Sequence, residues 1–226
     1  MDFSLTPEEL RVLGALVEKS IATPDNYPLS LNALVNACNQ LTARDPVVSY
    51  DESTVTRALD GLREKRLATL YHGADSRVAR YKHTLPDRFV LTPAEVAVLC
   101  VLMLRGPQTA GELRTRTERL YLFDTLAETE QTLDSLVTYT PEPLATKLPR
   151  QPGTKESRFA QLLSPPSPVA EGSVPRDVGL SLSPSRVSPP STPSPSTPTD
   201  ADRIAQLERD LAALRAEFAE FKKQFE

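Results

Sequence analysis

The chain reads LTPEELRVL at residues 5–13 and LTPAEVAVL at residues 91–99, so one pattern returns 86 residues later. Each copy predicts the start of a helix. A threonine stands at the N-cap, a proline takes the first helical position, and a glutamate three residues after the threonine closes a capping box. Apolar residues follow at helical spacing in both copies: Leu10, Leu13, Leu16 and Val17, then Val96, Leu99, Leu102 and Met103. The repeat divides the first 163 residues into two related halves.

Two more helices and a hairpin are predicted after the first copy. PLS at residues 28–30 introduces one helix, and Asp51 caps the next. Extended stretches at 67–71 and 78–83 flank the turn sequence GADS at 73–76, which predicts a β-hairpin. The residues expected to point inward are Leu31, Leu34, Val35 and Cys38 on the second helix, and Val55, Ala58, Leu59 and Leu62 on the third.

The second copy continues in the same order. After a break at Gly106-Pro107, helices are expected around 109–119 and over Leu126–Val137, and extended segments at 144–148 and 158–162 flank a turn containing PGT. Three helices followed by a two-stranded wing, twice, predict tandem winged-helix domains at residues 1–88 and 89–163. The fold class is then mainly α with small β-hairpin wings, an α+β arrangement.

Three segments of the first half also resemble a known family. They are residues 5–20, the run TPDNYPLSLNAL at 23–34, and VTRALDGL at 55–62. Together they are similar to the YceH-like family of bacterial proteins, over roughly residues 3–163. The resemblance implies two winged-helix domains in a cytoplasmic bacterial protein, and it brings no catalytic or metal-binding residues.

The proline content sets the end of the globular part. The chain has 21 prolines, and ten of them fall in residues 164–199 together with ten serines and three threonines. Such a segment buries too little apolar surface to offset its ordering entropy, so we expect a disordered Pro/Ser-rich linker over 164–199. Residues 200–226 form a separate C-terminal segment.

Several classes of protein are disfavoured by the residues present. No apolar run is long enough to span a bilayer, and the N-terminus lacks the pattern of a signal peptide, so we expect a cytoplasmic protein without a membrane partner. Cys38 and Cys100 sit inside amphipathic patterns and are expected to be reduced core residues. His72 and His83 lack metal-ligand spacing, and no phosphate loop or nucleophile motif occurs. We therefore expect no cofactor, no metal and no enzymatic activity.

Nucleic-acid binding has to be judged from local charge, because residues 1–85 carry ten Lys/Arg against eleven Asp/Glu. In a winged helix the third helix enters the major groove and the wing touches phosphates. The third helix is expected to turn Ser53, Arg57, Asp60 and Glu64 outward; the first two suit DNA, whereas the two acids do not. Cations cluster at the helix end and on the wing. The predicted DNA-contacting residues are Ser53, Arg57, Arg63, Lys65, Arg66, Arg77, Arg80 and Lys82.

Roughly 4–6 phosphate contacts from this set would give strongly salt-dependent binding. These cations can also have a purely structural role, with no contact to DNA. Cations at a helix C-terminus complement the helix dipole whatever the function, and charges on a wing solvate an edge strand.

The third helix of the second half is a poor candidate for reading DNA. It is expected to turn Glu128, Gln131 and Ser135 outward, and it contains no Lys or Arg. Arg114, Arg116 and Arg119 on the preceding helix, and Lys147, Arg150, Lys155 and Arg158 on the wing, leave phosphate contact by the wing open. Packing on the first half or on a protein partner is favoured.

The C-terminal segment has the spacing of a coiled coil. Its apolar residues recur at intervals of three and four, and the charges expected at facing g and e positions are opposite in sign. We expect a parallel coiled coil that joins copies of the chain; docking of a single helix on the globular part is the alternative. The heptad residues are Ile204, Leu207, Leu211, Leu214, Phe218, Phe221 and Phe225.

The sequence thus favours a non-enzymatic winged-helix protein that binds double-stranded DNA, resembles a transcription regulator and self-associates through its C-terminal coil. The alternative is a protein–protein adaptor in a cytoplasmic complex with no direct contact to DNA. A continuous positive face on the first half would favour the DNA-binding hypothesis over the adaptor.

Overall fold

The computed structural model describes residues 4–71, 78–150, 152–154 and 156–165. The chain divides into two compact units, Met1–Val174 and Pro175–Glu226, and every described residue belongs to the first. The predicted coiled coil at 200–226, and the predicted linker beyond Pro165, lie outside the described residues.

The first half has the predicted helices and strands, and it adds a 3₁₀ turn, a short helix after the hairpin and a short strand. Leu29–Ser30 forms a short strand, β1, directly before the second helix, and it pairs with the last strand of the half. The result is a three-stranded antiparallel sheet in the order β1-β3-β2, in which Tyr81 lies opposite both Leu29 and Leu70. The elements are α1 (Pro7–Ala22), a 3₁₀ turn (Pro24–Asn26), β1, α2 (Leu31–Cys38), α3 (Glu52–Glu64), β2 (Ala68–Tyr71), β3 (Arg80–His83) and α4 (Leu85–Arg88).

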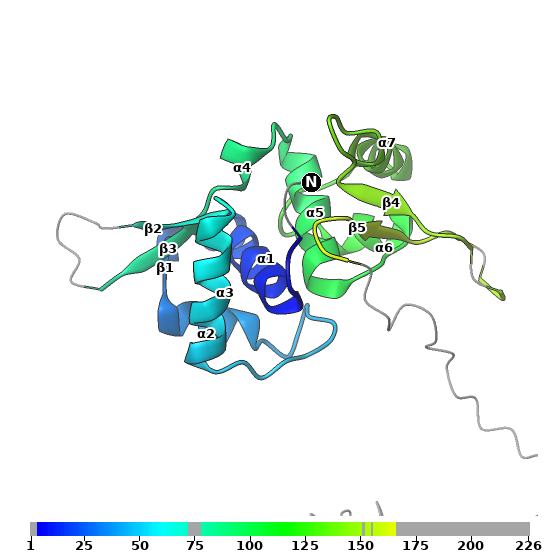
Figure 1. Ribbon diagram of the computed structural model, residues 1–226. Coiled ribbons are helices and arrows are strands. Elements are labelled where there is room, and N and C mark those ends of the chain that lie inside the picture. The colour runs from blue at the N-terminus through cyan, green and yellow to red at the C-terminus, as the bar shows by residue number, and fades with distance from the viewer. Residues whose placement is uncertain (1–3, 72–77, 151, 155, 166–226) are drawn as a thin grey trace, which may run out of the picture. The chain divides into compact units, whose positions relative to one another are not determined.

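The second half repeats this order with weaker strand pairing. Its two strands are antiparallel, and Gln108 forms an isolated bridge to Phe159 at the place that corresponds to β1. The elements are α5 (Pro93–Arg105), α6 (Ala110–Arg116), α7 (Leu126–Val137), β4 (Ala145–Lys147) and β5 (Phe159–Gln161). The described part is therefore mainly helical with small antiparallel strands, which confirms the predicted α+β class (Figure 1).

Both predicted capping boxes are present. The Thr6 hydroxyl accepts a hydrogen bond from the Glu9 N–H (3.2 Å), and the Glu9 carboxylate accepts one from the Thr6 N–H (2.8 Å). Thr92 and Glu95 repeat the arrangement at 3.3 and 2.7 Å. Each box satisfies amide groups that the first turn of a helix leaves without partners, which is why α1 and α5 begin where the sequence predicts.

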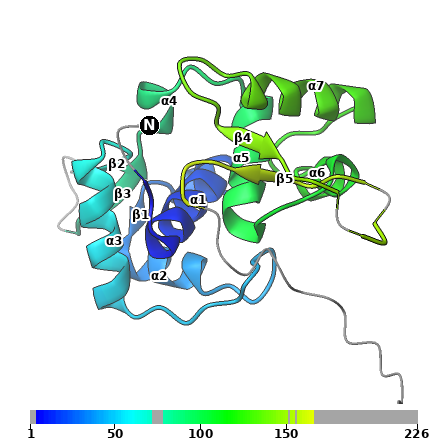
Figure 2. The same ribbon diagram turned by 45° about the vertical axis from the view of Figure 1, so that its right-hand side comes forward.

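The two halves meet along α1 and α5, which lie side by side in Figures 1 and 2. The Cys100 thiol donates to the Gly14 carbonyl at 3.5 Å, and these residues are 86 positions apart, the period of the repeat. A Cβ at Gly14 would lie 2.9 Å from the Leu104 side chain, so the close approach of the helices requires glycine here. Cys38 and Cys100 are buried free thiols, as predicted, and burial raises the pKa of Cys38 to about 12.

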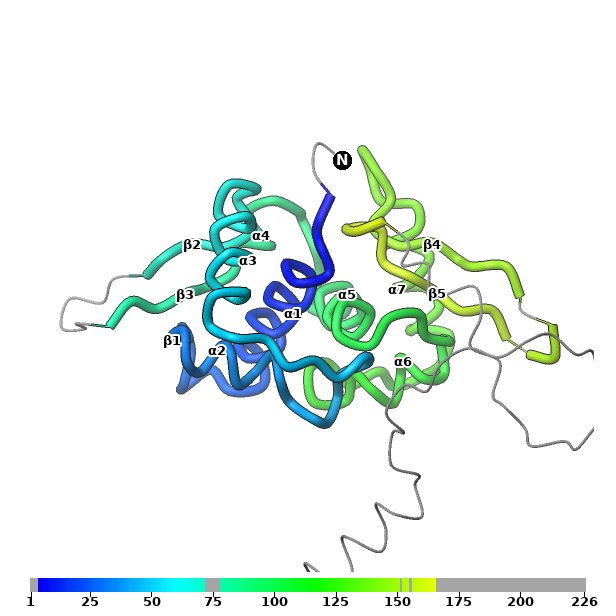
Figure 3. The backbone as a smooth tube through the Cα atoms, turned by 60° about the horizontal axis from the view of Figure 1, so that its bottom comes forward, coloured from blue at the N-terminus to red at the C-terminus, as the bar shows by residue number. Residues whose placement is uncertain are grey.

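Backbone hydrogen bonds add to this junction. The Asp45 N–H, in the loop between α2 and α3, donates to the Leu104 carbonyl at the end of α5 (2.9 Å). The Leu5 N–H donates to the Leu163 carbonyl (2.9 Å), which ties the N-terminal segment to the chain after β5; both segments can be followed in Figure 3. The buried core continues from one half into the other.

Within the described ranges, no helix has the length and apolar character to cross a membrane. The same residues contain no group of three or more His, Cys, Asp or Glu side chains that could hold a metal ion.

Candidate nucleic-acid interface

The N-terminal end of α3 is fixed by Asp51. Its carboxylate accepts hydrogen bonds from the Thr54 N–H at 2.8 Å and from the Ser53 hydroxyl at 3.0 Å. Hydrogen bonds from Thr54 and then Ser53 lower the pKa of Asp51 to about 2, so this carboxylate is ionised at neutral pH. The Ser53 hydroxyl, predicted to face DNA, is exposed but is engaged by its neighbour. The predicted inward residues of α3, namely Val55, Ala58, Leu59 and Leu62, are all buried.

The outer face of α3 carries the residues that the helical period predicts there. Arg57, Asp60 and Glu64 are all exposed. Arg57 makes only a long contact to the Thr54 hydroxyl (3.5 Å), so its guanidinium is available to a ligand. Asp60 pairs with Arg63 at 3.1 Å. This ion pair reduces the repulsion that Asp60 would exert on DNA. It also engages Arg63, which was predicted to contact phosphate.

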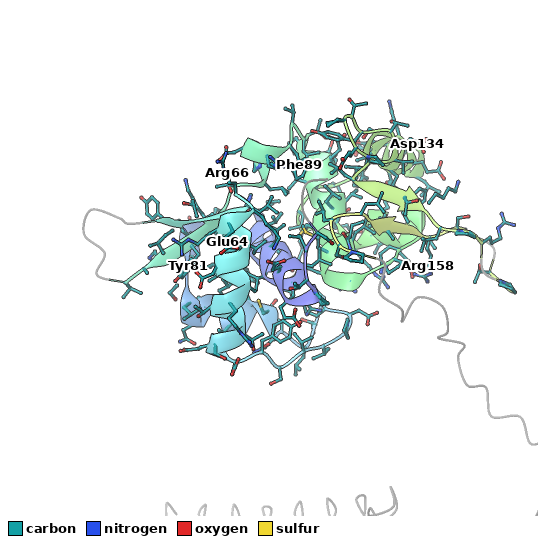
Figure 4. All side chains as sticks on the ribbon, in the orientation of Figure 1. Glu64, Arg66, Tyr81, Phe89, Asp134 and Arg158 are labelled. Atoms are coloured by element: carbon teal, nitrogen blue, oxygen red, sulfur yellow. The ribbon has the colours of Figure 1, made fainter. Side chains whose placement is uncertain are left out.

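At the C-terminal end of α3, Lys65 forms an ion pair inside the fold, whereas the Arg66 side chain forms none with any other described residue. The Lys65 ammonium lies 2.5 Å from the Glu9 carboxylate, whose side chain is only 5% exposed. Arg66 follows with a φ of 58°, and its N–H donates to the Arg63 carbonyl while the next N–H donates to Leu62. This is a Schellman motif with arginine where glycine is usual. The Arg66 residue is exposed, and Figure 4 shows it beside Glu64 at this end of the helix.

The strands β2 and β3 divide their side chains between two faces. Thr69 lies opposite Lys82, and Tyr71 lies opposite Arg80, so these four residues share the outer face of the sheet. Lys82 is exposed, whereas the Arg80 guanidinium donates to the Pro28 carbonyl at 2.9 Å and is half-buried. The predicted contact Arg77 lies outside the described residues.

The hydrogen bond from Arg80 to Pro28 has a counterpart in the second half, and neither bond was predicted from the sequence. Arg158 donates to the Pro107 carbonyl at 2.8 Å, so in each half an arginine near the last strand holds the proline that precedes the second helix. The signal was present in the sequence as a proline two residues before each N-cap and an arginine at the start of each returning strand. Both arginines therefore contribute to the fold, whatever else they contact.

His83 links the sheet to α1, a structural role that was not predicted from the sequence. Its Nδ1 lies 3.4 Å from the Leu85 N–H, and its Nε2 lies 2.9 Å from the Ser20 hydroxyl, which donates onward to the Val17 carbonyl. Burial lowers the pKa of His83 to about 4, with the charges of Asp87 and Lys82 acting in opposite directions. The imidazole is neutral at pH 7 and acts as a structural link.

The second half presents a different surface. Glu130, Gln131 and Asp134 are exposed on α7, and Figure 4 shows Asp134 on this helix. The helical period of α7 predicts that Leu126, Leu133, Leu136 and Val137 point inward. For Leu126 this prediction is wrong, because the residue is 43% exposed and Thr129 is buried one turn later. The reason is local: Tyr121 and Phe123 pack edge to face, with ring centroids 4.8 Å apart, and Phe123 fills the core near the start of α7.

The charges at the candidate interface thus separate into two groups. Arg57, Arg66 and Lys82 are exposed and form no ion pair with another residue that the structure describes. Arg63, Lys65 and Arg80 are paired with Asp60, Glu9 and the Pro28 carbonyl. The described part of the first half offers three cations to a ligand, fewer than the sequence indicates.

Comparison with known proteins places the chain in a family. Residues 5–154 match the family model described as "Protein of unknown function, DUF480". A UPF0502 protein of Opitutus terrae is 54% identical over 211 residues, which cover 93% of this chain and 83% of the relative. UPF0502 proteins of Solibacter usitatus and Geobacter sulfurreducens are 48% and 49% identical, and each alignment covers both chains in full. The resemblance found in the first half is confirmed, and the chain belongs to the DUF480/UPF0502 family of bacterial proteins.

Proposed function

We propose that each half of the chain is a winged-helix domain and that the first half binds double-stranded DNA. The order helix, short strand, helix, helix, strand, strand, with a three-stranded sheet β1-β3-β2, supports the winged-helix assignment. In this geometry α3 is the helix that enters the major groove, and β2 and β3 carry the wing. The chain acts by binding and carries out no chemical reaction.

The observation that carries the DNA-binding proposal is the exposed, unpaired state of Arg57, Arg66 and Lys82. They lie on α3, at its C-terminal end and on the outer face of the sheet, where a groove-reading helix and its wing contact phosphates. Each contact contributes about −0.9 to the slope of log K against log salt concentration. Three contacts predict a slope of about −3, with Arg77 as an additional contributor.

Fluorescence anisotropy of a labelled duplex at 50 and 200 mM salt tests this proposal. An Arg57→Ala/Arg66→Gly/Lys82→Ala variant should bind at least tenfold more weakly and with a shallower salt slope. Arg66→Gly is chosen because glycine adopts the left-handed φ of this position readily, so we expect stability to be kept or raised by about 0.5–1 kcal/mol. Arg119→Ala/Arg150→Ala, which removes two exposed cations of the second half, is the control, and it is compared with the double variant Arg57→Ala/Lys82→Ala, which removes the same number of charges from the first half.

Equal binding by the wild type and the triple variant would contradict the proposal, and so would the absence of binding by the wild type at 50 mM salt. An unfolding transition of the triple variant at or above that of the wild type shows that any loss of affinity reflects lost contacts with DNA.

A second candidate function is that of a protein–protein adaptor without contact to DNA. It is favoured by α7, which carries exposed acids and no Lys or Arg, and by the exposed Leu122 (68%) and Leu126 (43%) beside its start. Like charges disfavour an approach of this helix to phosphates, whereas exposed leucines suit a protein surface. A stoichiometric complex with one protein, lost in a Leu122→Asp/Leu126→Asp variant and unaccompanied by a DNA shift, would support this function.

We further propose that the C-terminal segment joins copies of the chain through a parallel coiled coil. The support is the heptad spacing of Ile204 to Phe225 in the sequence and the opposite charges expected at its facing positions. The proposed location of the protein is the cytoplasm.

A further inference from the structure

Tyr71, the last residue of β2, is a tyrosine on the surface of the first half. All six tyrosines of the chain lie within the described residues; Tyr71 is 42% exposed, and the other five are half-buried. Three of those five use their hydroxyl groups in hydrogen bonds within the fold, namely Tyr27, Tyr121 and Tyr139. The Tyr71 hydroxyl makes no hydrogen bond with another described residue. It can therefore donate to a ligand.

The strand register places Tyr71 beside Lys82. Tyr71 lies opposite Arg80, and Thr69 lies opposite Lys82, all on the outer face of the sheet. Tyr71 and Lys82 are then diagonal neighbours on this face. Such neighbours are about 7–8 Å apart, which is within reach of aromatic and long side chains. Because both residues are exposed, the phenol and the ammonium group can contact one ligand together.

The charges on the outer face suit an anion. Neither β2 nor β3 contains Asp or Glu. Lys82 supplies an exposed positive charge, and Arg80 supplies a half-buried one next to Tyr71, held by the Pro28 carbonyl. A phenol hydroxyl forms a stronger hydrogen bond with a charged oxygen than with a neutral one, and tyrosine is among the residues that donate to DNA phosphates.

We propose that the Tyr71 hydroxyl donates a hydrogen bond to a phosphate of the duplex that the first half binds, beside the phosphate contacted by Lys82. The inference rests on the proposed DNA binding and adds a contact that carries no charge. In Figures 1 and 3 the strands β2 and β3 extend away from the helices, as a wing that lies along a DNA backbone requires. A neutral donor releases no counterion, so Tyr71 contributes affinity that salt does not weaken.

Fluorescence anisotropy of the full chain with a labelled duplex at 50 and 200 mM salt tests the inference. Tyr71→Phe, which removes only the hydroxyl, should weaken binding about three- to tenfold, by the same factor at both salt concentrations. Lys82→Ala should weaken binding and also make the slope of log K against log salt concentration shallower by about 0.9. Tyr121→Phe, which removes a hydroxyl from the second half, is the matched control and should bind as the wild type does. Tyr71→Phe should keep the unfolding transition of the wild type, because the ring remains.

Equal affinities of Tyr71→Phe and the wild type would overturn this inference and leave the DNA-binding proposal intact. A shallower salt slope in Tyr71→Phe would also overturn it, because Tyr71 would then act by placing Lys82. An equal loss of affinity in Tyr121→Phe would show that the hydroxyl acts indirectly. The absence of binding by the wild type at 50 mM salt would reject the DNA-binding proposal itself, and this inference with it.

Discussion

At the scale of single residues, His83 shows how the fold determines the charge state of a side chain. His83 joins three parts of the first half. Its imidazole contacts the Ser20 hydroxyl on α1 and the Leu85 N–H at the start of α4, and its backbone N–H donates to the Tyr27 hydroxyl at 2.7 Å. Its Nδ1 can accept the Leu85 hydrogen bond only in the neutral form. Protonation would place a charge in a buried position and remove this bond.

Stability should therefore fall as the pH is lowered through the range set by His83. Its pKa is about 4 in the folded chain, against 6.5 for an unperturbed histidine, so the unfolded chain binds the proton first. The contribution is complete above pH 6.5 and is lost between pH 6.5 and 4, with a total on the order of 3 kcal/mol. Urea unfolding at several pH values would measure it. His83→Asn should lower the free energy of unfolding at pH 7 and flatten its dependence on pH. If the wild type and the variant lost stability in parallel as the pH fell, His83 would not titrate in this way.

At the scale of elements, the capping boxes do more than begin helices. The Glu9 carboxylate, 4% exposed as a residue, also receives Lys65 and lies against Gly61 of α3, where a Cβ would collide with it. In the second half Glu95 accepts a hydrogen bond from the Ser135 hydroxyl at 2.6 Å. The N-terminal end of the first helix in each half is thereby attached to the third helix, which positions α3 for the proposed DNA contact.

Replacement of Gly61 by alanine should destabilise the first half. The new methyl group would displace Glu9 from Thr6 and Lys65, and we expect a net loss of about 1–3 kcal/mol after the gain in helix propensity. Gly111→Ala is the matched control in α6, because its Cβ has nothing nearer than 4.0 Å; it should stabilise by about 0.5–1 kcal/mol. Equal effects of the two substitutions, measured by denaturant unfolding, would show that Glu9 adjusts without cost.

The elements also show which features the sequence could reveal. The starts of α1, α3 and α5 were predictable, because capping depends on residues three positions apart. The strand β1 was not, since two residues have no periodicity and are extended only through pairing with β3. The ion pair of Lys65 with Glu9 spans 56 residues, so a cation that seemed free in the sequence proved to be engaged.

At the scale of the whole molecule, self-association is expected to depend on residues 200–226, which lie outside the described residues. Deletion of 200–226 should give a monomer in sedimentation experiments at several concentrations, whereas the full chain should sediment as a dimer or larger species. Leu211→Asp should act like the deletion, because it places a charge in the apolar seam. Removal of 176–190 from the predicted linker should leave the oligomeric state unchanged. A full chain that sediments as a monomer would refute the coiled coil.

The contact between Gly14 and Cys100 has a consequence for the origin of the two-part architecture. Residues at corresponding places in two copies of a unit touch each other only on the axis that relates the copies, as in a symmetric dimer. Two separate identical chains would have to place the same amino acid on both sides of that axis. Covalent fusion removes this restriction, so one position can be a glycine, which leaves room for the Leu104 side chain, while the corresponding position carries a thiol that donates to the glycine carbonyl. Fusion also makes the association of the two halves independent of protein concentration.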